Sequence, residues 1–249
     1  QVYFDGCREV LQNYRALEDQ VRQIEHRVAG TVRVAAIYSV GLMQMESYTR
    51  RFAELYPDTQ VHLEYLHPDQ VYAQVLNDEA DIGLVSFPRH GGDLVSVDWQ
   101  EQQMVLVVPP GHALAGRNGH RVRTEDLTGL DFVSFTHDLA IRREVDRWFK
   151  RTKVAVTVKR EFDNIENIKR AIEAGSGVAV LPEPTVRQEV AAGSLVAVQF
   201  SDVTWYRPLG IVHKRHKQLT QAVRKLIELL HADPASFPKP NGASNHAPV

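Results

Sequence analysis

The sequence predicts an α/β protein of two lobes, joined by two chain crossovers and preceded by a long helix. Segments with strand and helix patterns alternate in the order strand, helix, strand, helix, strand over residues 31–87, and again over residues 131–182. This order is typical of an open parallel sheet with right-handed crossovers. In residues 1–30, apolar residues recur at alternating steps of three and four, which is the spacing of an amphipathic helix.

The leading segment, residues 1–30, is predicted to be a dimerising helix that ends at Gly30. Its apolar positions form an unbroken heptad seam, and charged or amide side chains occupy most positions between them. So narrow a stripe fits a partner helix better than the broad face of a core. The alternative is a single amphipathic helix lying on its own domain. The residues expected at the dimer seam are Val10, Tyr14, Leu17, Val21, Ile24 and Val28.

Composition favours an ordinary globular protein. Hydrophobic residues are 43% and charged residues 24% of the 249 positions, and the net charge of -2 argues against a strongly basic nucleic-acid surface within this chain. The single cysteine, Cys7, cannot form an internal disulfide, and we expect it to be a small buried residue in a reducing compartment. No apolar run is long enough for a membrane span and no signal peptide is recognised, so we expect a cytoplasmic protein without a membrane partner.

The first α/β unit begins with a β-branched strand over residues 31–39, which ends at Tyr38-Ser39. A helix closed by Pro57 follows, then an alternating strand over residues 61–66. Asp69 is suited to cap a short helix, and residues 81–87 form a continuous apolar strand typical of a position buried on both faces.

The middle of the chain departs from this order. Pro88 and the glycines after it end the unit, two further strands are predicted over residues 94–99 and 104–109, and residues 109–116 form a loop. The second unit then repeats the order, with strands at 131–135, 154–158 and 178–182 and helices between them. A strand, a last strand over residues 207–214 and a final helix complete the chain.

These elements divide the chain into two lobes that face each other across a cleft. Lobe I is predicted to comprise residues 31–108 and 208–232, and lobe II residues 109–207. The chain would cross over near Pro109 and return near residues 207–210, which makes a two-strand hinge. Residues 233–249 are rich in Pro, Ala, Ser and Asn and are predicted to be disordered.

The ordered set of segments resembles the linker helix and effector-binding part of LysR-type transcriptional regulators, over residues 1 to about 232. The segments that carry the resemblance are TVRVAAIYSVG, RRFAELYPDTQVHL, LNDEADIGLVS, VVPPGHALA and AIEAGSGVAVLPEPTV. The resemblance implies two lobes of the type II periplasmic-binding-protein kind with a small metabolite between them. It also implies a homodimer or homotetramer, and DNA binding through an N-terminal winged helix-turn-helix that is missing from this chain. One departure is Leu42-Met43-Gln44, where the family usually has Leu-Leu-Pro at the start of the first helix, so effector identity cannot be transferred.

The position of a binding site follows from the sheet. Ligands of open α/β sheets bind beyond the carboxyl ends of the strands, where free N–H groups of helix N-termini favour a carboxylate or a phosphate. Ser39 and Thr136 each place a hydroxyl at such a joint, either as a ligand contact or as a plain N-cap. The predicted effector-binding residues are Tyr38, Ser39, Val40, Gly41, Ser86, Phe87, Phe135, Thr136, His137, Asp163, Asn164, Leu181 and Pro182.

Other chemistries find little support in the sequence. His137 could bind an anion when protonated, although a solvated loop histidine is the commoner role. The pair His213 and His216 has no partner at metal-ligand spacing, and no dinucleotide loop, Walker loop or nucleophile elbow is present. We therefore expect no metal, no cofactor and no catalysis. The alternatives are a solute-binding receptor of a transporter, which would be monomeric, and a two-lobed enzyme.

Overall fold

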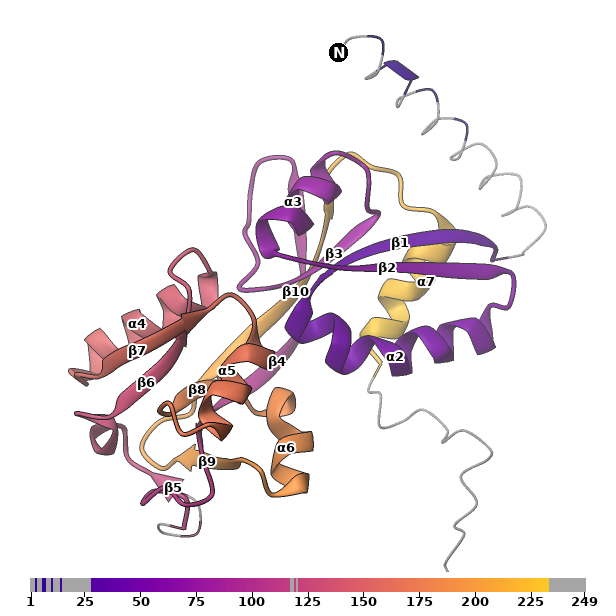
Figure 1. The fold of residues 1–249 in the computed structure, drawn as a ribbon. Coiled ribbons are helices and arrows are strands. Elements are labelled where there is room, and N and C mark those ends of the chain that lie inside the picture. Colours follow the sequence, from indigo (N-terminus) through magenta and orange to yellow (C-terminus); the bar gives the residue numbers. More distant parts are fainter. Residues whose placement is uncertain are drawn as a thin grey trace, which may run out of the picture.

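The computed structural model describes residues 28–116, 119 and 121–232, together with residues 3, 6, 7, 10 and 14 of the leading segment. Within these residues the fold is the predicted α/β arrangement of two lobes (Figure 1). The predicted seam residues Leu17, Val21 and Ile24 and the predicted disordered tail, residues 233–249, lie outside the described residues.

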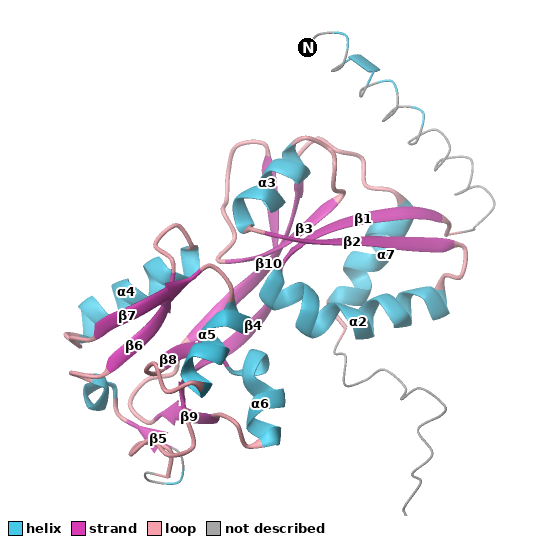
Figure 2. Ribbon diagram, in the orientation of Figure 1, coloured by secondary structure: helices cyan, strands magenta, loops and turns pink. Residues whose placement is uncertain are grey.

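Lobe I contains the first α/β unit and the final helix. Strands β2, β1 and β3 are parallel neighbours, with Gly30 opposite Thr59 and Val34 opposite Ile82. Helix α3 lies on one face of this sheet, and α2 and α7 lie together on the other (Figure 2). The elements are β1 (Gly30–Ile37), α2 (Tyr38–Leu55), β2 (Thr59–Leu66), α3 (Pro68–Leu76), β3 (Ile82–Ser86), β10 (Tyr206–Lys214) and α7 (Gln221–Leu230).

Lobe II contains the second unit, with a less continuous sheet. Strands β6 and β7 are parallel, and β6 meets the start of β8 through a single parallel bridge between Phe132 and Val178. Strands β8 and β9 both pair antiparallel with β4. The elements are β5 (Arg121–Val122), η2 (Thr124–Leu127), β6 (Asp131–Phe135), α4 (Ala140–Thr152), β7 (Thr157–Phe162), α5 (Ile165–Glu173), β8 (Ala179–Pro182), η3 (Glu183–Val186), α6 (Arg187–Ala192) and β9 (Val196–Phe200).

One long strand, β4 (Leu94–Val108), replaces the two strands predicted for this region. Residues 94–103 of β4 pair with β10, and Met104–Val108 pair with β8 and β9 in lobe II. A polar run, residues 100–103, lies between the two predicted strands, but two of its amide side chains have partners inside the protein. Gln100 donates to the Tyr48 hydroxyl at 2.9 Å, and Gln102 is buried against Arg207. The antiparallel β4–β10 pair therefore forms the hinge (Figure 1).

Each lobe has its own hydrophobic core. The lobe I core gathers buried residues such as Phe52, Val71 and Leu84, and the lobe II core gathers others around Trp148. Met104–Val108 are buried in the lobe II core, so the chain enters that core several residues before the predicted crossover at Pro109.

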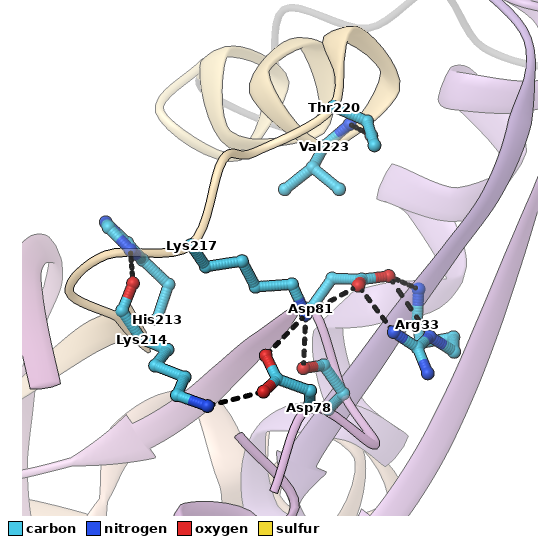
Figure 3. A network of polar contacts seen from close by, with 9 residues as sticks. Arg33, Asp78, Asp81, His213, Lys214, Lys217, Thr220 and Val223 are labelled. Carbon is cyan, nitrogen blue, oxygen red and sulfur yellow. Dashed lines mark hydrogen bonds and ion pairs between the residues drawn. The ribbon is translucent and has the colours of Figure 1, made fainter. Parts of the chain in front are cut away.

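An ion network fastens the returning chain to lobe I (Figure 3). Asp81, in the turn before β3, binds the Arg33 side chain at 2.8 Å and Lys217 at 3.0 Å, while Lys214 reaches Asp78. Burial raises the pKa of the Asp81 carboxyl, but the hydrogen bond from Arg33 and the charge of Lys217 outweigh burial and hold this pKa below its usual value. The network therefore ties the segment after β10 to β1 and to the turn before β3.

The described residues of the leading segment are helical, as predicted. Val10 and Tyr14 of the predicted seam are exposed in the single chain, while Val28 is half-buried and packs against the lobe I core. Cys7 is also exposed, so the expectation of a buried cysteine is wrong for the isolated chain. None of the described helices is both long enough and apolar enough to cross a membrane.

Candidate functional site

A cavity of about 420 Å³ lies between the lobes and takes walls from both. Lobe I contributes the joint between β1 and α2, the start of α3 and the end of β3. Lobe II contributes the joint between β6 and α4 and the start of α5, while Arg207 comes from the hinge strand β10. These are the carboxyl ends of strands and the N-termini of helices, where ligands of open α/β sheets bind.

The cavity brings together a little over half of the predicted effector-binding residues. They come from four separate stretches of sequence, which supports the use of strand ends to locate the site. The predicted residues that line it are Tyr38, Ser39, Ser86, Phe87, Phe135, Asp163 and Asn164.

Val40 and Gly41 do not line the cavity because α2 begins earlier than expected. The helix starts at Tyr38, directly after β1, which turns Val40 into the lobe I core with no exposed surface. A Cβ atom on Gly41 would lie 2.1 Å from the Tyr65 ring, so glycine is required there by packing.

Thr136 and His137 also lie outside the lining of the cavity. The Thr136 hydroxyl is buried and has no partner at hydrogen-bond geometry among the described residues, but its proximity is the main cause that lowers the pKa of the nearby Asp138 carboxyl. The His137 ring turns to a charged cluster of lobe II, 3.3 Å from the Glu161 carboxylate and 3.2 Å from the Arg142 guanidinium.

Leu181 and Pro182 are likewise absent from the lining. Leu181 is fully buried in the lobe II core, and Pro182 pairs with Met104 of β4. Strand β8 is thus used for the sheet of lobe II and not for the cavity. The proposed roles of these residues in effector contact gain no support from the geometry.

Ser39 has a role other than N-capping. The N-cap of α2 is Ile37, which has no side-chain hydrogen bond, and Ser39 lies in the first turn. The Ser39 hydroxyl oxygen accepts a hydrogen bond of 3.0 Å from Nη1 of Arg207. On the opposite wall, Asn164 is a true N-cap, because its side chain accepts from the Asn167 N–H at 2.9 Å.

Arg207 is the charged group at the hinge end of the cavity. It is 1% exposed, and its Nη2 donates to the side-chain oxygen of Gln102. Burial lowers the pKa of Arg207 to about 9, which still leaves the guanidinium charged at neutral pH. Among the described residues, no carboxylate forms an ion pair with it.

The other arginines on the walls differ from Arg207. Arg89 pairs with Asp69 at 2.7 Å, and Arg147 pairs with Glu144 at 2.7 Å. Arg143 is exposed and donates to the Asp138 carbonyl at 2.7 Å. Their charges are compensated by carboxylates or water, whereas that of Arg207 is not.

An ion pair crosses the cavity from one lobe to the other. Nε2 of His67, the N-cap of α3 in lobe I, lies 3.0 Å from the Asp138 carboxylate of lobe II. Nδ1 of the same ring accepts from the Asp69 N–H at 3.4 Å. With Nδ1 as an acceptor, the ring N–H of a neutral His67 lies on Nε2, the atom that faces the Asp138 carboxylate.

Phe87 links the lobes through its backbone. Its φ of 49° is left-handed, which is rare for a bulky residue. Its N–H donates to the Pro208 carbonyl of β10 at 2.9 Å, and its ring packs against the lobe II core although β3 belongs to lobe I. The strained conformation is therefore held by the hinge strand on one side and lobe II on the other.

The family model described as the LysR substrate binding domain matches residues 25–235. The chain belongs to the LysR substrate-binding family. It is the effector-binding part of a LysR-type regulator, and its α/β fold is the type II periplasmic-binding-like fold that was predicted. The family match favours this assignment over a transporter receptor.

Relatives of this LysR-type domain support the match. An uncharacterized HTH-type transcriptional regulator, YeiE of Escherichia coli K12, is 25% identical over 220 residues, which cover 88% of this chain and 73% of YeiE. The CcmR regulatory domain of Synechocystis PCC6803 in complex with 2-PG has a TM-score of 0.74 at 25% identity, over 84% of this chain and 100% of that one. The effector-binding domain of QuiR in complex with shikimate shares the fold, with a TM-score of 0.73 at 13% identity over 82% of this chain and 96% of QuiR's.

The polar residues that line the cavity of this LysR-type domain but were not predicted from the sequence include Arg207, His67 and Asp138. Arg207 precedes a proline in what read as an ordinary strand, and its burial next to Gln102 depends on β4 being continuous. Asp138 follows the predicted His137, and His67 follows the predicted strand over residues 61–66, but the pairing of these two side chains across the cavity depends on how the lobes face each other. Among the described residues, no group of three or more metal-ligating side chains is placed to hold a metal ion.

Proposed function

We propose that this LysR-type domain senses a small polar metabolite in the cavity between its lobes, and that binding changes the angle between the lobes. The observation that carries the proposal is a single cavity with walls from lobe I, lobe II and the hinge. A ligand that contacts Ser39 and Asn164 together would favour one lobe arrangement over others. A coupling of about 1–3 kcal/mol is enough for a useful switch.

The output would be transcriptional. The regulator would bind DNA through an N-terminal domain that this chain does not include, and it would act as a homodimer or homotetramer joined by the seam of the leading helix. Exposed Val10 and Tyr14 support that role for the seam. We propose binding without catalysis. Three wall carboxylates, Asp69, Asp138 and Glu144, each lie against a basic side chain, and the fourth, Asp163, accepts a hydrogen bond from the Asn164 amide.

Thermal unfolding of the chain with a panel of neutral, cationic and anionic metabolites tests this proposal. At a hundredfold excess over Kd, a ligand stabilises the folded state by about 2.7 kcal/mol, which raises Tm by about 5–10 °C for a chain of this size. Calorimetric titration then gives the Kd, and small-angle scattering the change in lobe arrangement.

A pair of matched variants places the ligand. Ala140→Phe adds a ring where Ala140 lines the cavity, whereas Ala191→Phe adds the same ring on an exposed position of α6. We expect Ala140→Phe to abolish the Tm shift and Ala191→Phe to retain it. A panel with no stabilising compound, or a ligand that binds both variants equally, would refute the proposed site.

A further inference from the structure

The cavity contains a buried cation, Arg207, that has no counter-charge among the described residues. The guanidinium of Arg207 is bonded to Ser39 and Gln102, both of which are neutral, and its Nε has no hydrogen-bond partner among the described residues. Burying a charge is costly unless it is paired, so a guanidinium that lines a cavity in this state is suited to an anionic ligand.

The N-terminus of α2 lies beside Arg207 in the same cavity and is a second feature that favours an anion. This helix of 18 residues has an N-cap without a side-chain hydrogen bond and no acidic residue in its first turn. Its first N–H groups lack intrahelical partners and carry partial positive charge. Ser39, in that turn, accepts from Arg207 and has no acceptor among the described residues for its own O–H, which it can donate to a ligand.

We infer that Arg207 is the receptor for one anionic group of the effector, a carboxylate or a phosphate, which it binds together with the Ser39 hydroxyl and the N-terminus of α2. This inference rests on the proposed function and adds the chemical class of the ligand and the residue that selects it. A single unpaired buried cation fits a single anionic group, and apolar wall residues such as Phe87 and Phe135 fit the uncharged remainder.

The position of Arg207 gives the anion a direct connection to the hinge. Arg207 lies opposite Gln102 in the β4–β10 pair, and the register of that pair shifts two residues later, between Leu209 and Gly210. An anion bound to Arg207 would thus change the charge inside the hinge itself, at the strand pair about which the lobes turn.

Titration of the chain with inorganic phosphate and, separately, with acetate tests the inference, with sodium chloride holding the ionic strength constant. The Nε–H resonance of Arg207 in nitrogen-15 NMR spectra, identified by its loss in Arg207→Met, is the readout. We expect a saturable shift of this resonance with at least one anion; the anion that binds more tightly indicates phosphate or carboxylate chemistry. Glycerol, a neutral polyol, should cause no such shift.

Two variants of Arg207 and one control variant distinguish the effect of its positive charge on anion binding from an effect on folding. Arg207→Met should weaken binding of the anion about 30-fold or more, and Arg207→Lys, which keeps the charge, should bind with intermediate affinity. Arg143→Met removes an arginine from the same cavity, but an exposed one, and should leave the affinity within about twofold.

Three results would overturn the inference. They are an Arg207 resonance that neither anion moves, an anion affinity that falls as much in Arg143→Met as in Arg207→Met, and a neutral effector that binds Arg207→Met normally but not Ala140→Phe. The last result would leave the proposed function intact, which distinguishes failure of the anion receptor from failure of the effector cavity.

Discussion

Arg207→Met should leave the unliganded protein as stable as before, or more stable. A buried charged residue usually stabilises the fold through a partner, and its loss then costs about 3–5 kcal/mol. Arg207 lacks a carboxylate partner among the described residues, so its charge is a cost that the unliganded protein bears for the sake of binding. Methionine keeps an unbranched apolar chain of similar length in the same space.

The magnitude follows from burial and from the lost hydrogen bonds. Lowering the pKa of Arg207 from 12.5 to about 9 corresponds to an unfavourable burial of the charge of about 5 kcal/mol, at about 1.4 kcal/mol for each pKa unit. Against this, two hydrogen bonds from a charged donor, to Ser39 and Gln102, are lost at about 2 kcal/mol each. The expected outcome is a gain of about 1 kcal/mol, or a rise in Tm of about 2–4 °C.

Urea unfolding of the unliganded chain, followed by circular dichroism, measures this change. Gln102→Leu is the matched control, because it leaves Arg207 buried with one acceptor fewer and should lower stability by about 2 kcal/mol. A loss of about 3 kcal/mol or more in Arg207→Met would show that the guanidinium holds the hinge together, and would refute the account of an uncompensated charge.

Three further predictions concern parts of the molecule outside the anion contact. Asp81→Asn should lower Tm by about 5–10 °C, because Arg33 loses its carboxylate partner and Lys217 keeps only Asp78 among the described carboxylates, at 3.4 Å. The folded pKa of Asp81 is depressed, so its stabilisation is present above pH 4 and lost on acidification, and the variant should flatten the acid limb of the pH–stability curve below pH 4. Asp138→Ala should open the lobes by removing the contact with His67, which shifts the closed population by up to about fivefold and increases the radius of gyration in scattering; an unchanged radius would show that the pair does not hold the lobes. Val10→Glu should dissociate the oligomer in light scattering whereas the off-seam Gln12→Glu should not, and equal masses for both variants would remove the seam from the interface.

The predicted elements and the observed ones agree best where the pattern is local. The hydrophobic pattern found every major strand and helix of lobe I, because half-buried strands alternate, helices repeat every three or four residues, and a strand buried on both faces, such as β3, is continuously apolar. The predicted starts of the helices were less accurate. Ile37 and His67 precede α2 and α3 as N-caps, where Ser39 and Asp69 had seemed better suited, since the start of a helix depends on where the preceding strand stops pairing.

The hinge shows the limit of local pattern. Gln100–Gln103 is a polar run that interrupts the apolar pattern, yet it forms the middle of β4 because Arg207 and Tyr48 supply polar partners inside the protein. Nothing local to either segment indicates that pairing, as the bonded residues lie far apart in the chain.

By itself, the sequence determined the α/β class and the order of strands and helices in two lobes, because these are recorded in residue periodicity over short spans. The family came from the resemblance of ordered motifs, which the family model then matched over residues 25–235. Only the tertiary structure decided which strand ends face each other. In it, Ser39, Phe87 and Asn164 line one cavity, whereas the His137 ring lies outside that cavity against Glu161. It also buried Arg207 without a counter-charge at the hinge, since desolvation depends on everything packed around a group and not on its neighbours in sequence.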